Sequence, residues 1–171
     1  SKPIAPEDLI AWFRDDPPDF AAGGGFHYNN SAYFLLGEIV AKVSGKPFAT
    51  CLDEMFFGPL GMKNTGIYRN ASPPPHAAVG YSIVEGKATP ALEWDMSWAG
   101  GAGALYSTVG DLFLWNEALF GGKVLKPASF KDMITPVQLP EGVDGLNYGY
   151  GLMISELSRL PAIGHGGGLN G

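Results

Sequence analysis

The sequence predicts a mixed α+β fold in which several helices come first and a short antiparallel strand pair comes last. Two observations predict it. Up to about residue 147, apolar residues recur at helical spacing in stretches that are bounded by Gly or Pro. After that point two short, Gly-punctuated, β-like segments follow, YGYGLMI and AIGHGGG. We therefore divide the chain into a helix-rich region, 1–147, and a strand pair, 148–171, which begins a sheet that it does not complete.

Local signals place the first two helices. The first is expected to begin at Pro6, with acidic residues in its opening turn, and to stop at 15–18, where two aspartates precede two prolines. The second follows the stretch FHYNNSAYFLLGEIVAKVSG, in which the apolar residues of 32–43 mark one helical face. A serine and a glycine at 44–45 end this helix.

A third helix is expected from Pro47 to about Phe57, where Gly58 and Pro59 close it. The stretch GYSIVEGKATP alternates weakly around 85–86, which predicts a short hairpin. Cys51 falls on the helical apolar pattern of the third helix, and we interpret it as a small buried side chain. Since it is the only cysteine, the chain forms no intramolecular disulfide.

The stretch STVGDLFLWNEALFGG predicts another helix. Ser107 or Thr108 can cap it, Asp111 lies in its first turn, and two glycines at 121–122 stop it. Pro127 begins a further short helix. Because an isolated strand pair is marginally stable in water, the glycine-rich ending leads us to expect that more strands follow in a longer parent protein.

Composition limits the function. The 171 residues are 46% hydrophobic and 12% aromatic, which is enough for a packed core. The net charge is −6 and no basic cluster occurs, so nucleic acid and anionic membrane surfaces are poor candidate partners. No apolar run approaches the roughly 18 residues of a transmembrane segment. The compartment stays open.

Tyr28 and Asn30 are the first candidates for chemistry. A tyrosine that acts as a general base must lose a proton that normally leaves near pH 10, so it needs a cationic neighbour and a fixed geometry. The Asn30 amide both donates and accepts hydrogen bonds, and it could orient a substrate or a lysine. The competing interpretation is a helix start, in which a polar residue caps the backbone and Tyr28 packs on the core. On spacing alone that structural interpretation is favoured.

The stretch GHGGGLNG is the second candidate. His165 places a titratable group beside glycine N–H donors, which is a plausible oxyanion site, although a glycine-rich surface turn explains it equally well. An α/β-hydrolase esterase requires a G-x-S-x-G elbow, and a phosphate-binding loop requires G-x-x-x-x-G-K-[ST]. The sequence has neither motif.

Metal and cofactor sites are not expected. The three histidines, His27, His76 and His165, are far apart, and neither H-E-x-x-H nor paired-cysteine spacing occurs. His27 and His76 are interpreted as solvated loop residues. The paired carboxylates lie at turn or helix-surface positions, where solvation explains them.

In their joint order these segments resemble the serine β-lactamase-like superfamily, which includes class C β-lactamases, penicillin-binding proteins, related esterases and D-aminopeptidases. The matching segments are PEDLIAWF, F-x-Y-x-N-S-A-Y-x-L-L-G-x-I-V-x-K-V-S-G, F-x-P-L-G-M-K-N-T, A-G-G-A-G-x-x-S-T-x-x-D-L, Y-G-Y-G-L and G-H-G-G-G. The resemblance implies the helix-rich region of the β-lactamase/transpeptidase-like fold. It also implies acyl transfer or hydrolysis of a small-molecule or peptide substrate, without a metal or another cofactor.

The resemblance assigns roles by motif. The family's Y-x-N motif falls on Tyr28 and Asn30, which implies a general acid/base and an orienting amide. The K-T-G or H-x-G motif falls on His165 and Gly167, with His165 in place of a lysine. The N–H of Gly168 would then match one oxyanion donor, and Gly167 would contribute to substrate binding.

The first motif of the family, S-x-x-K, is missing, because no serine in the sequence is followed by a lysine three residues later. The chain alone is therefore expected to be inactive, as part of a serine hydrolase that is a β-lactamase, carboxypeptidase or esterase in type. A non-catalytic binding or scaffold protein on the same fold is the alternative. A third interpretation is a single folding region with ordered helices and frayed terminal strands.

Overall fold

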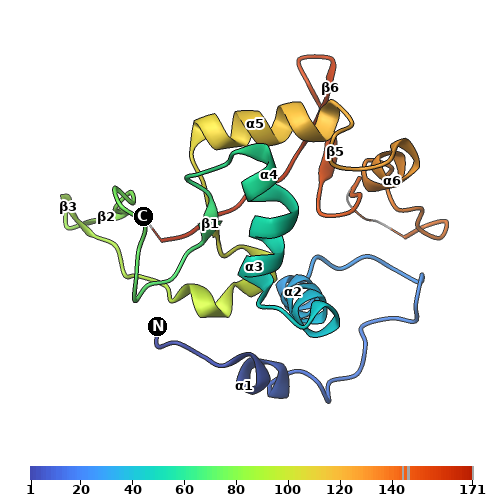
Figure 1. The fold of residues 1–171 in the computed structure, drawn as a ribbon. Helices are drawn as coiled ribbons and strands as arrows, with labels where there is room; N and C mark the ends of the chain where they lie inside the picture. Colours follow the sequence, from blue (N-terminus) through green and yellow to red (C-terminus); the bar gives the residue numbers. More distant parts are fainter. Residues whose placement is uncertain (144, 146, 171) are drawn as a thin grey trace. The chain divides into compact units, whose positions relative to one another are not determined.

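Residues 1–143, 145 and 147–170 are described by a computed structural model of the chain (Figure 1). The chain divides into two units. Unit 1 consists of Ser1–Asp15, Asn30–Leu112 and Gly167–Gly171, and unit 2 consists of Asp16–Asn29 and Phe113–Gly166. The division at residue 147 into a region with the Y-x-N motif and a region with the H-x-G motif stays a prediction.

The helices of unit 1 occur where the sequence predicts them, with two differences: the first helix ends at Ala11, before the expected stop at 15–18, and the third continues past its expected stop. They are α1 (Pro6–Ala11), α2 (Asn30–Ser44), α3 (Phe48–Leu52), the π-helical turn η1 (Asp53–Phe57) and α4 (Gly58–Leu60). The predicted stop at Gly58 and Pro59 is wrong, because Gly58 keeps helical dihedral angles and the stretch from α3 to α4 is continuous (Figure 1). The left-handed Gly61, with φ of 72°, ends it as a C-cap.

Helix α2 packs against the 3₁₀ turn η3 (Gly100–Ala102) through glycines. A Cβ on Gly37 would lie 3.1 Å from the Cα of Gly101, and a Cβ on Gly101 would lie 2.6 Å from the carbonyl oxygen of Tyr33. Phe34, which is 3% exposed, lies against Gly100 at the same contact. The glycines of AGGAGALYST therefore permit close backbone approach between η3 and α2.

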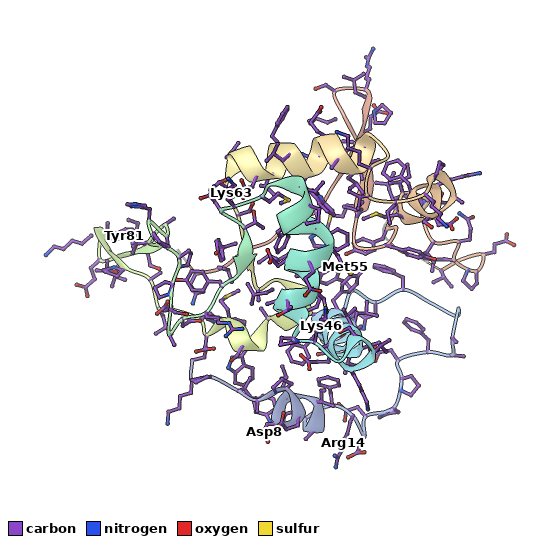
Figure 2. All side chains as sticks on the ribbon, in the orientation of Figure 1. Asp8, Arg14, Lys46, Met55, Lys63 and Tyr81 are labelled. Carbon is purple, nitrogen blue, oxygen red and sulfur yellow. The ribbon has the colours of Figure 1, made fainter. Side chains whose placement is uncertain are left out.

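The junction between α2 and α3 holds the single cysteine. Cys51 is 5% exposed, and its Sγ lies 3.0 Å from the Oγ of Ser44, so the interpretation as a small buried side chain is confirmed. Lys46, which Figure 2 labels, lies at the same junction. Its Nζ donates to Glu54 at 2.5 Å, and this hydrogen bond raises the pKa of Lys46.

Unit 1 also contains two short antiparallel pairs. Strands β2 (Tyr81–Val84) and β3 (Lys87–Pro90) form the predicted hairpin. Its turn has positive φ at both central residues, 49° at Glu85 and 76° at Gly86, which is the hairpin geometry that favours glycine. Strands β1 (Gly66–Ile67) and β4 (Leu105–Tyr106) were not predicted, because strands of two residues carry no readable alternation.

The N-terminal segment is fixed to the 3₁₀ turn η2 (Met96–Trp98). The Oγ of Ser97 accepts a hydrogen bond from the N–H of Ile4 at 2.9 Å, and the indole N–H of Trp98 donates to the Lys2 carbonyl at 2.7 Å. The rings of Trp12 and Trp98 meet edge to face at 5.1 Å between centroids. These contacts place α1 within unit 1.

Asp111 joins the loop after α4 to the start of α5 (Val109–Phe120). Its carboxylate accepts hydrogen bonds from the backbone N–H of Asn64 at 2.7 Å and from the hydroxyl of Thr65 at 2.8 Å. Figure 2 labels Lys63, the residue before this contact, near the beginning of α5. Burial acts to raise the pKa of Asp111, but the hydrogen bonds from Thr65 and Asn64 outweigh it, so the pKa lies below its ordinary value.

Unit 2 contains the end of α5, the short helix α6 (Pro127–Met133) and the pair β5 (Met153–Leu157) and β6 (Leu160–Gly164). Figure 1 labels the two strands side by side. They pair antiparallel, with Ile154 opposite Ile163. The predicted strand YGYGLMI begins later than expected, because its first half forms only an isolated bridge between Tyr148 and Met153. No helix in the described residues has the length and apolar character needed to cross a bilayer.

Candidate active site

Tyr28 lies in unit 2, in the loop that precedes α2. Its side chain is 42% exposed, so it is not the fully packed staple that a purely structural helix start would use. The centroid of its ring lies 5.7 Å from that of the His165 imidazole, and the two planes are inclined by 34°. The structure thus brings together the tyrosine of the Y-x-N motif and the histidine of the H-x-G motif.

Tyr148 is the shared neighbour of these two residues. It is 6% exposed, and its ring meets the Tyr28 ring edge to face at 6.2 Å and the His165 ring edge to face at 5.7 Å. Phe26 packs on the same ring at 5.6 Å. We call Tyr28, Tyr148 and His165 the ring cluster, and all of it belongs to unit 2.

The backbone around Tyr148 is fixed on both sides. Its carbonyl accepts a hydrogen bond from the N–H of Val137 at 2.9 Å, and the next residue, Gly149, donates to the carbonyl of Leu152 at 2.8 Å. A Cβ at Gly149 would overlap the carbonyl oxygen of Met133, so only glycine fits there. Tyr148 therefore presents its ring from a constrained segment.

His165 follows directly after the last residue of β6. Its Nδ1 lies 2.5 Å from the carbonyl oxygen of Gly166, and since a carbonyl oxygen only accepts, Nδ1 carries the proton. In neutral His165 the free lone pair is then on Nε2, and protonation adds a second N–H donor there. The hydrogen bond to Gly166 thus leaves Nε2 as the nitrogen that faces other partners through its lone pair or its proton.

His27, the residue before Tyr28, is exposed as predicted and has a partner. Its Nδ1 lies 2.5 Å from a carboxylate oxygen of Asp19, and both residues belong to unit 2. Because both side chains are largely exposed, the pair contributes little to stability on its own. It nevertheless closes the loop 19–27 just before Tyr28.

The other predicted site residues lie in unit 1. Asn30 is the exposed first residue of α2, two residues after Tyr28. Gly167 and Gly168 are exposed, and open space surrounds the position of a Cβ on either of them. Their N–H groups are therefore not screened by side chains. A single site that combines all five predicted residues stays a prediction.

In the described part of the chain, no group of three or more His, Cys, Asp or Glu residues lies close enough together to hold a metal ion. His76 is exposed and has a positive φ of 60°, as expected for a residue in a turn after three prolines.

Tyr148 was not predicted as a site residue from the sequence. It lies in the Y-G-Y-G-L segment, which was interpreted only as a strand. The single available signal was the pair of glycines beside aromatic residues, which indicates close backbone approach without naming a partner.

Residues 2–171 match the protein family described as Beta-lactamase. Among curated relatives, penicillin-binding protein 4* of Bacillus subtilis is 29% identical over 89% of this chain and 36% of its own length. The D-aminopeptidase of Gluconobacter oxydans is 27% identical over 89% of this chain and 29% of its own length.

A comparison with a solved structure concerns the fold itself. The D-stereospecific amidohydrolase from Streptomyces sp. superposes with a TM-score of 0.83 and 29% identity, over 99% of this chain and 51% of that protein. The predicted α+β fold class is thereby confirmed. The chain spans about a third of the length of these curated relatives and about half of the solved structure. The chain belongs to the Beta-lactamase family.

Proposed function

We propose that this chain supplies the acid–base and oxyanion groups of a serine hydrolase that cleaves an amide or ester through an acyl-enzyme. Family membership supports this reaction class. The names of two similar proteins, a D-aminopeptidase and a D-stereospecific amidohydrolase, favour an amide bond next to a D-configured residue as the substrate. β-Lactam and ester substrates remain the alternatives within the class.

The observation that carries the proposal is the contact between Tyr28 and His165 in the ring cluster. In the proposed reaction the Tyr28 phenolate takes the proton of the serine hydroxyl as Oγ bonds to the substrate carbonyl carbon. When the tetrahedral intermediate collapses, the bond to the leaving nitrogen or oxygen breaks, and Tyr28 returns the proton to that atom. A protonated His165 beside the ring would favour the phenolate by charge attraction.

The family's motifs supply the other proposed roles. The N–H of Gly168 would donate to the developing oxyanion, together with the N–H of the nucleophilic serine. Gly167 would let the substrate backbone approach closely, because it carries no side chain. The Asn30 amide would orient the substrate or the lysine of the S-x-x-K motif.

The nucleophile is proposed to come from polypeptide beyond these 171 residues. No S-x-x-K occurs in the sequence, and the chain spans about a third of each curated relative. The chain alone would then bind without forming an acyl-enzyme. This is the distinction between the proposed enzyme and its rival, a non-catalytic binding protein on the same fold.

The test is intact-mass measurement after incubation with a fluorophosphonate or β-lactam probe. It compares the 171-residue chain with a form that is extended by the upstream coding sequence of its gene. The proposal predicts no added mass on the chain and one added probe on the extended form, at the serine of an S-x-x-K. An upstream sequence without that motif, or an extended form that stays unlabelled, would favour the non-catalytic alternative.

A further inference from the structure

The loop before Tyr28 is joined at its two ends by a side-chain contact. Asp19 begins this loop and His27 ends it, and the Nδ1 of His27 lies 2.5 Å from a carboxylate oxygen of Asp19. Since a carboxylate only accepts, Nδ1 carries the hydrogen in the neutral as well as in the charged imidazole. The contact between the two ends of the loop therefore does not depend on the charge of His27.

The loop is rich in glycine and therefore costly to order. Its sequence, DFAAGGGFH, contains three consecutive glycines, and Gly23 has a positive φ of 77°. Glycine loses more conformational freedom on folding than any other residue. The N–H of Gly24 donates to the carbonyl of Ala21 at 2.8 Å, and the ring of Phe20 lies against Gly25. Both contacts lie within the loop, so they do not determine where it delivers Tyr28.

The residues on either side of His27 have a different partner. Phe26 and Tyr28 both contact the ring of Tyr148, at 5.6 and 6.2 Å between centroids. His27, between them, contacts Asp19. The segment 26–28 is therefore held by two separate sets of contacts, aromatic contacts through its first and third residues and the hydrogen-bonded pair through its middle residue. All of these residues belong to unit 2.

Tyr28 depends on its backbone for its position. Its side chain is 42% exposed, so packing covers only part of the ring. A general base has to lie within hydrogen-bond reach of the proton that it takes, and a displacement of about 1 Å can cost about 10²-fold in rate. A contact that fixes the backbone directly before Tyr28 can therefore affect the proposed reaction without touching the substrate.

We propose that Asp19 and His27 are positioning residues, which hold the backbone before Tyr28 so that its ring stays beside His165. The inference rests on the proposed function, because this geometry has a consequence for the reaction only if Tyr28 moves the proton. It adds two residues outside the family's motifs to those on which the reaction depends.

The test measures the geometry of the ring cluster in the 171-residue chain, so it requires neither the nucleophile nor turnover. Nuclear Overhauser cross-peaks between ring protons report the Tyr28–His165 and Tyr148–His165 contacts separately, since both pairs of centroids are 5.7 Å apart. Asp19→Ala removes the pair without changing any ring. It should shift the segment 26–28 toward release by up to about fivefold, the effect of one exposed ion pair. The Tyr28–His165 cross-peak should therefore weaken relative to the Tyr148–His165 cross-peak, whereas a general loss of stability would weaken both equally.

Substitutions of His27 test whether the hydrogen bond to Asp19 carries this effect. His27→Ala should match Asp19→Ala, and the double substitution should add nothing further, because two residues that act through one contact are not additive. His27→Asn should restore most of the Tyr28–His165 cross-peak, because its amide N–H can take the place of the Nδ1–H.

Glu54→Ala is the matched control. It breaks the pair between Glu54 and Lys46, which is equally short at 2.5 Å and about half exposed, and which lies in unit 1. Both cross-peaks should keep their intensities in this variant.

An unchanged ratio of the two cross-peaks in Asp19→Ala would overturn the inference. So would equal weakening of both cross-peaks, additive effects of the Asp19 and His27 substitutions, or the same change in Glu54→Ala. In each of these cases the proposed acid–base role of Tyr28 stays open, since the labelling experiment on the extended protein tests it separately. Failure of that labelling would, in turn, leave the measured ring positions as they are.

Discussion

The imidazole of His165 lies 5.7 Å from the ring of Tyr28, and both rings meet the edge of the buried Tyr148. The two family motifs are thus connected within unit 2 by an aromatic residue that belongs to neither of them. If Tyr148 positions the two rings, then changes at this residue should alter the surroundings of His165 before they alter the rest of unit 2.

Replacing Tyr148 tests this positioning role. Tyr148→Leu removes the ring that both neighbours contact, whereas Tyr148→Phe keeps it. We expect the His165 ring protons to shift by a few tenths of a ppm or more in Tyr148→Leu, because they lose an aromatic neighbour at 5.7 Å, and to stay close to their original values in Tyr148→Phe. Proton NMR measures this shift. Unchanged His165 resonances in a folded Tyr148→Leu chain would contradict the role.

Glycine substitutions test the contact between α2 and η3. Gly101→Ala should lower the free energy of unfolding by about 1–3 kcal/mol, because its Cβ would press on the Tyr33 carbonyl oxygen. Gly110→Ala is the matched control in the first turn of α5, where the nearest atom would be 3.9 Å away. It should raise stability by up to about 1 kcal/mol, because alanine favours the helix. Urea denaturation measures the free energy of unfolding of both variants. Equal effects of the two substitutions would refute the close contact between α2 and η3.

The N-cap of α5 is a second stability test. The Oγ1 of Thr108 accepts the N–H of Asp111 at 3.2 Å, which satisfies one of the unpaired N–H groups at the helix start. Thr108→Ala should therefore lower the free energy of unfolding by about 1 kcal/mol, and Thr108→Ser should restore most of it. The same urea midpoint for Thr108→Ala and Thr108→Ser would show that the side-chain oxygen at this position does not cap the helix.

Acid should destabilise the chain through Asp111. Because hydrogen bonds from Thr65 and Asn64 place its pKa in the folded state below the ordinary 3.8, folding favours the charged form. This contribution to stability is fully present above the pKa that Asp111 has in the unfolded chain. It is lost as the pH falls through the pKa that Asp111 has in the folded chain. Asp111→Asn should reduce the loss of stability between about pH 5 and pH 2. The exposed Asp8→Asn, on α1 (Figure 2), should leave the loss in place.

Local signals in the sequence predict some of these elements and not others. Helix α2 and the hairpin were predictable, since apolar period and turn residues are local properties. The end of α4 was not predictable from the sequence. Gly58 and Pro59 are typical helix breakers, but here the backbone stays helical at Gly58 and leaves the helix only at Gly61.

For the site, the motifs identified Tyr28 and His165 as candidates, but nothing local indicated that Tyr148 contacts both of them. The hydrogen bond that the Asn64 N–H donates to Asp111 likewise joins residues 47 positions apart, and neither hydrophobic periodicity nor a capping rule predicts such a contact. Non-local contacts of this kind depend on how the elements pack. They could therefore be recognised only in the folded chain.

The most direct test of the central claim is the acylation rate of the extended protein that carries an S-x-x-K, compared between the unmodified form and Tyr28→Phe. Phenylalanine keeps the ring contacts with Tyr148 and His165 but removes the hydroxyl. If Tyr28 moves the proton of the serine, acylation by a β-lactam or fluorophosphonate probe should slow by about 10²- to 10⁴-fold, while probe affinity stays the same. An unchanged acylation rate would contradict the claim and leave Tyr28 as a packing residue of the ring cluster.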